Sequence, residues 1–493
     1  MTIKRLLPLA VAAVLASCSS FALRQAQGDT VGSSAEHGVL PAARSRGDTF
    51  EAQQSMCHPE QRAQLCHPER SAERGVEGRR TSTSPIEHVV FIIQENRSFN
   101  NLFMGYPGAT TQNYGYNSKG KKIALHAQGL DTSWDLDHSA QNFFNVCDGQ
   151  GSLPGTDCKM DGWDTEGAGF KHPPKPAYGY TPKKEVQPYW DIANQYVIAD
   201  QMFASNLDGS FIAHQYAIAA YASRAVDSPG FRWGCEGGKT NTIGTLTNAR
   251  TFGPRIAACF DYPTIGSKAD KAGVSWRYYT SPIYSDGGLW SAYQADGKIY
   301  KGPDWKNDVI TPQSQFLTDV AAGKLANVTW ITPTYEASDH AGFSSNQGPA
   351  WVASLVDAIG ASKFWDSTAI FIMWDDWGGW FDPVPPVYED YDGLGFRVPL
   401  LVISPYAKQG SVTHTQYETA SVLRYMEDNF GLPQLAQSDA RANDPAVDPT
   451  VLDYSQPPRT FKKIAGSKPL SYWIRLERNS RFHGVPGTII GDD

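Results

Sequence analysis

The sequence predicts an α/β fold, a three-layer sandwich around a mostly parallel sheet. Short apolar runs without polar–apolar alternation are typical of strands buried on both faces, as parallel strands are. Helical stretches at 349–361 and 419–430 lie between such runs, and strands that alternate with helices indicate a doubly wound sheet. The runs that we interpret as strands are 89–93, 328–331, 369–374 and 398–403.

Length and composition set the first limits on function. The chain has 493 residues, of which 41% are hydrophobic, 12% aromatic and 19% charged. These values suit one large α/β domain with insertions, or two smaller domains, and exclude collagen, a coiled coil and wholesale disorder. The formal net charge of −8 argues against a nucleic-acid-binding chain. A phosphorylated substrate would be met locally, by a metal ion or by helix N-termini.

Residues 1–18 predict an export signal. Lys4 and Arg5 precede an apolar run at 6–15, which is too short to span a bilayer permanently but suits a signal-peptide core. The run leads into Leu-Ala-Ser-Cys, ending at Cys18, which resembles the lipobox of bacterial lipoproteins; the alternative is an ordinary cleavable signal peptide. We expect an outer-membrane or cell-surface lipoprotein with an N-terminal lipid anchor in the membrane, or a periplasmic or secreted protein.

Residues 19–84 predict a disordered, low-complexity tether. The first 85 residues contain only two aromatic residues, Phe21 and Phe50, so this stretch cannot bury enough apolar surface to offset its ordering entropy. The tetrapeptide Cys-His-Pro-Glu occurs twice, at 57–60 and 66–69. Two Cys-His pairs suggest zinc, but their spacing does not match known structural zinc sites, and we favour a duplicated tether sequence.

Four further cysteines lie in the part that we expect to fold. An even number of cysteines in an exported chain predicts disulfides. Nearest-neighbour pairing closes the shortest loops, although four cysteines allow three connectivities. The nearest-neighbour pairs are Cys147 with Cys158, and Cys235 with Cys259.

Acidic and amide residues follow two of the predicted strands directly. Glu95 and Asn96 end the first, and Asp375 and Asp376 end the third. Ligands bind beyond the carboxyl ends of parallel strands, and these oxygen groups form a set suited to one divalent cation. The alternative is that 375–379 is only a polar turn. We favour the metal site because two adjacent carboxylates at a sheet edge are costly without a counter-charge.

A serine is the candidate nucleophile. Ser210 ends a turn-like stretch and precedes an Ala- and Ile-rich helical segment at 211–222, and a helix N-terminus attracts phosphoryl groups. The alternative is that Ser210 only caps the helix. His214, four residues on, would lie on the same helical face. His138 and His340 stand in turn-rich contexts, where a histidine either supplies protons and binds oxyanions or is merely structural.

Taken together, these motifs resemble the bacterial phosphoesterase family. This family includes phosphatidylcholine-type phospholipases C and secreted acid phosphatases and belongs to the alkaline phosphatase superfamily. The likeness runs in order over 86–435 and departs from the family at Asn100, where Asp is frequent, and around Ser210, where prolines are frequent. The matching stretches are 86–99, 137–139, 160–162, 208–216, 338–340, 374–382, 397–405 and 415–432.

The resemblance implies an alkaline phosphatase-like sandwich with inserted loops and one bound divalent cation of unspecified identity. It places the catalytic domain at 85–435, followed by a small C-terminal extension at 436–493 packed on the main domain. The residues implied as metal ligands are Glu95, Asn96, Ser210, Asp375 and Asp376.

The same resemblance implies a two-step reaction. Ser210 would attack phosphorus to give a phosphoserine, which water then hydrolyses. His138 and His340 would stabilise phosphoryl oxygens or protonate the leaving group. We therefore expect an exported metal-dependent phosphoesterase, an acid phosphatase or a phospholipase C, whose substrate is a phosphate ester or a phospholipid.

Aromatic residues around the metal motif suggest one substrate feature. A cage of aromatic rings binds choline through cation–π contacts, whereas the alternative is that these rings simply pack in the core. The rings are those of Trp374, Trp377, Trp380 and Phe381. A second hypothesis from another class is a non-catalytic surface lipoprotein that binds phosphorylated or choline-bearing ligands on the same fold.

Overall fold

The computed structural model describes residues 84–230 and 233–479. The predicted signal peptide, the lipobox, the repeated Cys-His-Pro-Glu and nearly all of the tether lie outside the described residues. Among the residues described, no helix has the length and the apolar character needed to cross a lipid bilayer.

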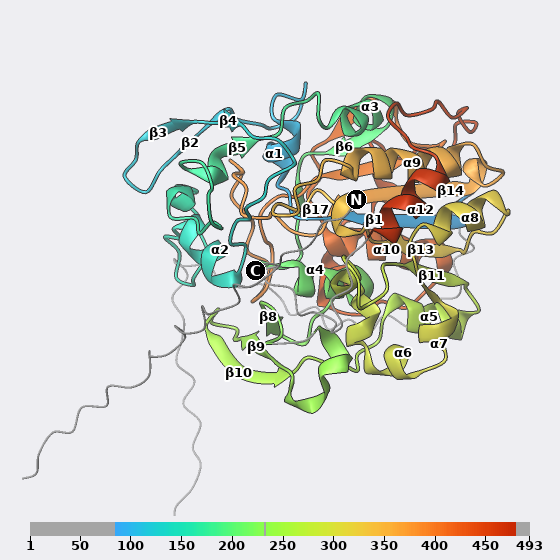
Figure 1. Ribbon diagram of the computed structural model, residues 1–493, viewed down its shortest axis with the longest axis horizontal. Coiled ribbons are helices and arrows are strands. Elements are labelled where there is room, and N and C mark those ends of the chain that lie inside the picture. Colours follow the sequence, from blue (N-terminus) through green and yellow to red (C-terminus); the bar gives the residue numbers. More distant parts are fainter. Residues whose placement is uncertain (1–83, 231–232, 480–493) are drawn as a thin grey trace, which may run out of the picture. The chain divides into compact units, whose positions relative to one another are not determined.

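A central eight-stranded sheet forms the core of the fold (Figure 1), in the order β12-β11-β13-β1-β14-β15-β6-β16. All neighbours pair in parallel except β15, which is antiparallel to both β14 and β6. The predicted mostly parallel sheet is thus confirmed. Its strands are β1 (His88–Gln94), β6 (Val197–Ala199), β11 (Trp276–Tyr279), β12 (Val309–Ile310), β13 (Val328–Ile331), β14 (Thr368–Trp374), β15 (Leu400–Ile403) and β16 (Ser411–Thr413).

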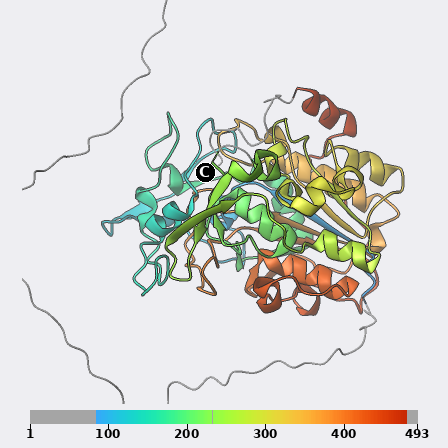
Figure 2. The same cartoon turned by 90° about the horizontal axis from the view of Figure 1, so that it is seen from below.

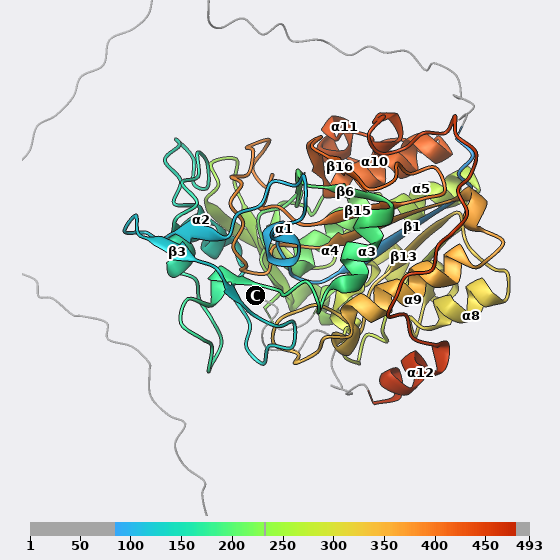
Figure 3. The ribbon, with the colours of Figure 1, turned by 90° about the horizontal axis from the view of Figure 1, so that it is seen from above.

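Helices cover both faces of this sheet, as a three-layer sandwich requires (Figure 3). One layer contains α10 (Thr419–Phe430) and the other contains α3 (Gln187–Gln195), α8 (Gln315–Ala321) and α9 (Gly348–Gly360). The helices predicted at 349–361 and 419–430 correspond to α9 and α10. The other helices are α1 (Phe99–Phe103), α2 (Ala140–Cys147), α4 (Ser210–Ala219), α5 (Ile265–Ala272), α6 (Gly297–Lys301), α7 (Asp304–Asn307), α11 (Gln437–Arg441) and α12 (Leu470–Arg478).

Shorter strands lie outside the central sheet. The largest group is the three-stranded sheet β10-β9-β8, which lies beside α4 (Figures 1 and 2). Most of these shorter strands lie in segments that connect the elements of the central sandwich. The shorter strands are β2 (Tyr114–Tyr116), β3 (Lys122–Ala124), β4 (His126–Ala127), β5 (Gly179–Tyr180), β7 (Met202–Phe203), β8 (Ala225–Val226), β9 (Thr242–Leu246), β10 (Phe252–Ala257) and β17 (Tyr417–Glu418).

Two disulfides close loops outside the central sheet. Cys147 bonds to Cys158 and Cys235 bonds to Cys259, which is the nearest-neighbour pairing. Near the end of the described chain, Trp473 of α12 is buried against Trp351 of α9, with 4.9 Å between ring centroids. The domain boundary at 435/436 stays a prediction.

β1 and β14 fix the position of the candidate site. Every residue of both strands is buried, and the pairing register runs from His88 opposite Thr368 to Gln94 opposite Trp374. Because the strands are parallel and in register, the residues that follow them leave the same edge of the sheet side by side.

Candidate active site

The ends of β1 and β14 bring four predicted ligands together. Glu95 and Asn96 follow β1, and Asp375 and Asp376 follow β14. The backbone N–H of Asn96 donates to Asp375 Oδ1 over 2.9 Å, which ties the two strand ends to each other. The close approach also requires Gly378, because a Cβ there would stand 2.1 Å from the Asn96 carbonyl oxygen.

Ser210 lies against this strand-end group. Its Oγ is 3.2 Å from Asn96 Oδ1 and 3.2 Å from Asp376 Oδ2. The residue at the cap position of α4 is Gly209, and Ser210 is the first helical residue. The interpretation of Ser210 as a simple N-cap is therefore wrong, and its hydroxyl faces the oxygens of the two strand ends instead.

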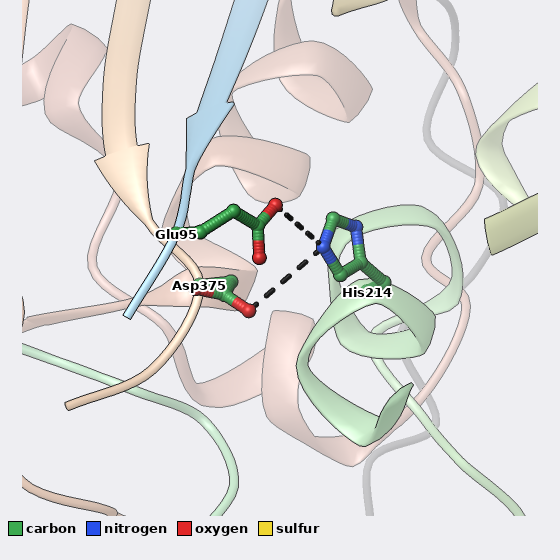
Figure 4. A group of neighbouring side chains, drawn as sticks. All are labelled: Glu95, His214 and Asp375. Atoms are coloured by element: carbon green, nitrogen blue, oxygen red, sulfur yellow. Dashed lines mark hydrogen bonds and ion pairs between the residues drawn. The ribbon is translucent and has the colours of Figure 1, made fainter. Parts of the chain in front are cut away.

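His214 occupies the same face of α4, one turn after Ser210. Figure 4 shows its imidazole facing two carboxylates that follow neighbouring strands. Nε2 lies 3.1 Å from Glu95 Oε1 and 3.8 Å from Asp375 Oδ2. The sequence points to His214 only through its spacing from Ser210, and the metal ligands that the family resemblance implies do not include it.

The donor set fits a divalent cation. The side chains of Glu95, Asp375 and Asp376 are at most 1% exposed, and burying carboxylates without a counter-charge is costly. Among the described residues, Asp375 Oδ2 makes no hydrogen bond. Ser210 Oγ, Asn96 Oδ1 and Asp376 Oδ2 form a group of three oxygen atoms. The serine hydroxyl supplies the one proton that they share. Carboxylate and amide oxygens at this spacing are ligands for a hard cation.

His138 binds the Asn96 side chain. Its Nδ1 is 2.7 Å from the Leu136 carbonyl oxygen and its Nε2 is 2.9 Å from Asn96 Nδ2. A carbonyl only accepts, so Nδ1 carries the proton and Nε2 accepts from the amide. This contact turns Asn96 Oδ1 toward Ser210.

His340 lies on the same side of the site. Its ring centroid is 6.0 Å from that of His138, and it stacks on Trp290 at 5.8 Å. Nδ1 contacts the carbonyl oxygen of Ala341, so Nδ1 is the protonated nitrogen of the neutral ring and Nε2 is the one that could exchange a proton.

Asp339 holds the loop that carries His340. Its Oδ2 accepts from the Tyr189 hydroxyl at 2.7 Å and from Trp374 Nε1 at 3.0 Å. Arg97 Nε donates to its backbone carbonyl at 2.7 Å. Burial raises the pKa of Asp339 to about 6, although Tyr189 and the Arg97 charge act in the opposite direction.

The aromatic rings near the metal motif do not form an open cage. All four are at most 1% exposed, and Arg97 stacks over Trp380 at 4.5 Å. They pack with other apolar residues in the interior, which is the alternative that the composition suggested. The rings are those of Trp374, Trp377, Trp380 and Phe381.

An α/β sandwich with polar groups gathered at the carboxyl edge of its sheet is typical of enzymes that bind ligands at that edge. Residues 86–433, well over half of the chain, match the Phosphoesterase family. The chain belongs to that family and is a phosphoester hydrolase.

The comparisons include several phospholipases C. Phospholipase C A of Mycobacterium tuberculosis is 25% identical, over 71% of this chain and 73% of that protein. Hemolytic phospholipase C of Pseudomonas aeruginosa is 24% identical, over 72% and 54%. Non-specific phospholipase C1 of Arabidopsis thaliana is 23% identical, over 73% and 70%. These relatives do not favour the hypothesis of a non-catalytic binding protein.

Similar solved structures share little sequence with this chain. An alkaline phosphatase superfamily protein from Vibrio parahaemolyticus is 10% identical over 73% of this chain and 71% of that one, with a TM-score of 0.33. Murine ectonucleotide pyrophosphatase/phosphodiesterase 5 is 8% identical over 55% and 96%, with a TM-score of 0.36.

The raised pKa of Asp339 predicts a pH-dependent contribution to stability. The folded protein binds the Asp339 carboxyl proton more tightly than the unfolded chain does. Protonated Asp339 therefore contributes fully to the free energy of unfolding below the pKa of an aspartate in the unfolded chain. This contribution is lost as the pH rises through about 6. Asp339→Asn removes the titration. Urea unfolding between about pH 4 and pH 7 should show the free-energy difference between the native protein and the variant shrinking as the pH rises. Parallel profiles would contradict the assignment.

Proposed function

We propose that this protein is an exported, metal-dependent hydrolase of phosphoric esters that acts through a phosphoserine on Ser210. The observation that carries the proposal is the position of Ser210 at the start of α4, within 3.2 Å of oxygens that follow two adjacent strands. The hydroxyl lies at the positive N-terminal end of a helix and beside oxygen atoms of the kind that bind divalent cations.

A divalent cation would be held by groups from both strand ends and would contact Ser210. When bound, it neutralises phosphoryl charge and polarises the serine hydroxyl. The proposed ligands are Glu95, Asn96, Ser210, Asp375 and Asp376.

The first step forms the bond between Ser210 Oγ and phosphorus and breaks the bond from phosphorus to the ester oxygen. Asp376 Oδ2, at 3.2 Å, is placed to accept the serine proton. The backbone N–H groups at the start of α4 face the phosphoryl oxygens. His340 in its doubly protonated form donates the Nε2 proton to the leaving oxygen and is left as the neutral ring, and His138 keeps the Asn96 amide in position.

In the second step, water attacks the phosphoserine. A new bond forms from the water oxygen to phosphorus as water gives a proton to His340 Nε2, and Ser210 Oγ leaves and regains its proton from Asp376. The products are the alcohol of the ester and a free phosphate or phosphomonoester, which corresponds to a phosphatase or a phospholipase C.

Membrane phospholipids are a natural substrate class for such an enzyme. Several relatives are named phospholipase C, and a lipid anchor at Cys18 would keep the catalytic domain, residues 85–435, near a membrane through the tether at 19–84. The extension at 436–493 would pack on this domain. Phosphomonoesters are the second class, and the rates of the native protein on p-nitrophenyl phosphorylcholine and on p-nitrophenyl phosphate distinguish the two.

Ser210→Ala should lower the hydrolysis of both p-nitrophenyl phosphate and p-nitrophenyl phosphorylcholine by roughly 10³-fold or more, because the nucleophile is lost. Acid quenching during turnover should leave a phosphoryl group on Ser210, detected by mass spectrometry of the peptide. Ser411→Ala, on the edge strand β16, is the matched control and should keep full activity. Retained activity in Ser210→Ala would refute the proposed nucleophile.

Removal of the cation should abolish hydrolysis without unfolding the protein. We expect dialysis against a chelator to remove activity and added divalent ions to restore it, because three buried carboxylates then face the substrate without a counter-charge. Circular dichroism would report whether the fold persists. Full activity in a protein shown to be metal-free would exclude metal dependence.

The proposed role of His340 predicts a dependence on the leaving group. His340→Gln should slow the hydrolysis of alkyl phosphate esters much more than that of p-nitrophenyl esters, since the nitrophenolate leaves without a proton. The ratio of kcat/KM values for the two ester types measures the effect. An equal loss for both types would assign His340 to phosphoryl binding instead.

A further inference from the structure

The six side chains of the site form two groups of three. Ser210, Asn96 and Asp376 are joined by the serine hydroxyl. The other group consists of His214, Glu95 and Asp375, and one ligand atom from each lies within 4.8 Å of the other two (Figure 4). The second group thus offers one nitrogen and two carboxylate donors to a common partner.

The spacing in the second group fits coordination around one ion. Metal–ligand distances near 2.1 Å place neighbouring ligand atoms about 3.0 Å apart in an octahedral site and about 3.4 Å apart in a tetrahedral one. His214 Nε2 stands 3.1 Å from Glu95 Oε1 and 3.8 Å from Asp375 Oδ2. All three side chains are at most 1% exposed.

A hydrogen bond alone accounts for only part of this geometry. His214 Nε2 can share a proton with Glu95 Oε1 at 3.1 Å. The 3.8 Å separation from Asp375 Oδ2 is too long for a hydrogen bond, and that buried oxygen makes no hydrogen bond to any described residue. A cation placed among the three atoms gives each of them the same partner.

We propose that His214 Nε2 is a direct ligand of the ion and that it makes the site selective for a borderline transition metal, such as Zn²⁺ or Mn²⁺, over Ca²⁺ and Mg²⁺. This inference rests on the metal dependence in the proposed function. Calcium and magnesium take oxygen ligands almost exclusively, whereas imidazole suits first-row transition metals. The i, i+4 spacing on α4 places the nucleophile and the nitrogen ligand on one helical face.

Pulsed EPR of the Mn²⁺-loaded protein tests the inference directly. The native protein should show a nitrogen coupling to the metal, which should disappear in His214→Gln and persist in His414→Gln, whose side chain is 61% exposed. Labelling the native protein with ¹⁵N-histidine should change the coupling, which gives a measurement that does not depend on the folding of a variant.

Competition between divalent ions for the metal-free protein measures the selectivity of the site for Zn²⁺ over Ca²⁺. We expect the native protein to bind Zn²⁺ far more tightly than Ca²⁺, and His214→Gln to lose roughly 100-fold or more in Zn²⁺ affinity with little change for Ca²⁺. Tight Mn²⁺ binding without any nitrogen coupling would overturn this inference and leave the proposed function standing. A folded protein that binds no divalent ion would overturn both.

Discussion

The in-register pairing of β1 with β14 is the constraint on which the whole site depends. The ladder ends at Gln94 and Trp374, so Glu95 emerges beside Asp375 and Asn96 beside Asp376. A slip of one residue would turn every side chain of one strand to the other face of the sheet. Since both strands are fully buried, the hydrophobic core specifies the register and, through it, the placement of the polar groups.

The helix α4 supplies the remaining two side chains of the site, Ser210 and His214. Its position is also fixed by the core. Every residue of α4 is buried, which is typical of a helix enclosed on all sides. Trp330 of β13 donates its indole N–H to the Ala217 carbonyl oxygen at 2.9 Å, which ties α4 to the sheet. The first turn of the helix therefore cannot shift without disturbing the core, and Ser210 and His214 meet the strand ends in one arrangement.

Local sequence predicted the elements that carry strong patterns. The long apolar runs became β1, β13, β14 and β15, and the nearest-neighbour cysteine pairs form the disulfides. The sequence did not predict β6, β12 and β16, because strands of two or three residues give too short a pattern. It did not predict β11 because Arg277 interrupts the apolar run of that strand. It also did not show that β15 runs antiparallel to its neighbours, since strand direction depends on tertiary pairing.

The sequence predicted the residues of the candidate site that follow a strand, but not the contacts that depend on how distant elements pack. Residues that directly follow an apolar strand, such as Glu95 and Asp375, have a local signature. The contact of His214 with these carboxylates has none, because it depends on where α4 packs against the sheet. The hydrogen bond from Asn96 to His138 joins residues 42 positions apart, and only the folded chain shows that His138 orients an amide.

Charge balance connects this architecture to its chemistry. Three buried carboxylates lie close to the position where a phosphoryl group would meet Ser210, and a phosphate ester is itself anionic. The N-terminus of α4 contributes the equivalent of about half a positive charge, which does not offset three carboxylates. Of the two buried histidines beside the site, His138 accepts a hydrogen bond from the Asn96 amide at Nε2 and so carries no charge, and a protonated His340 would add only one positive charge. The phosphoryl group therefore requires a positive charge that these elements do not supply, and this imbalance is the physical reason to place a divalent cation between the two strand ends and the helix.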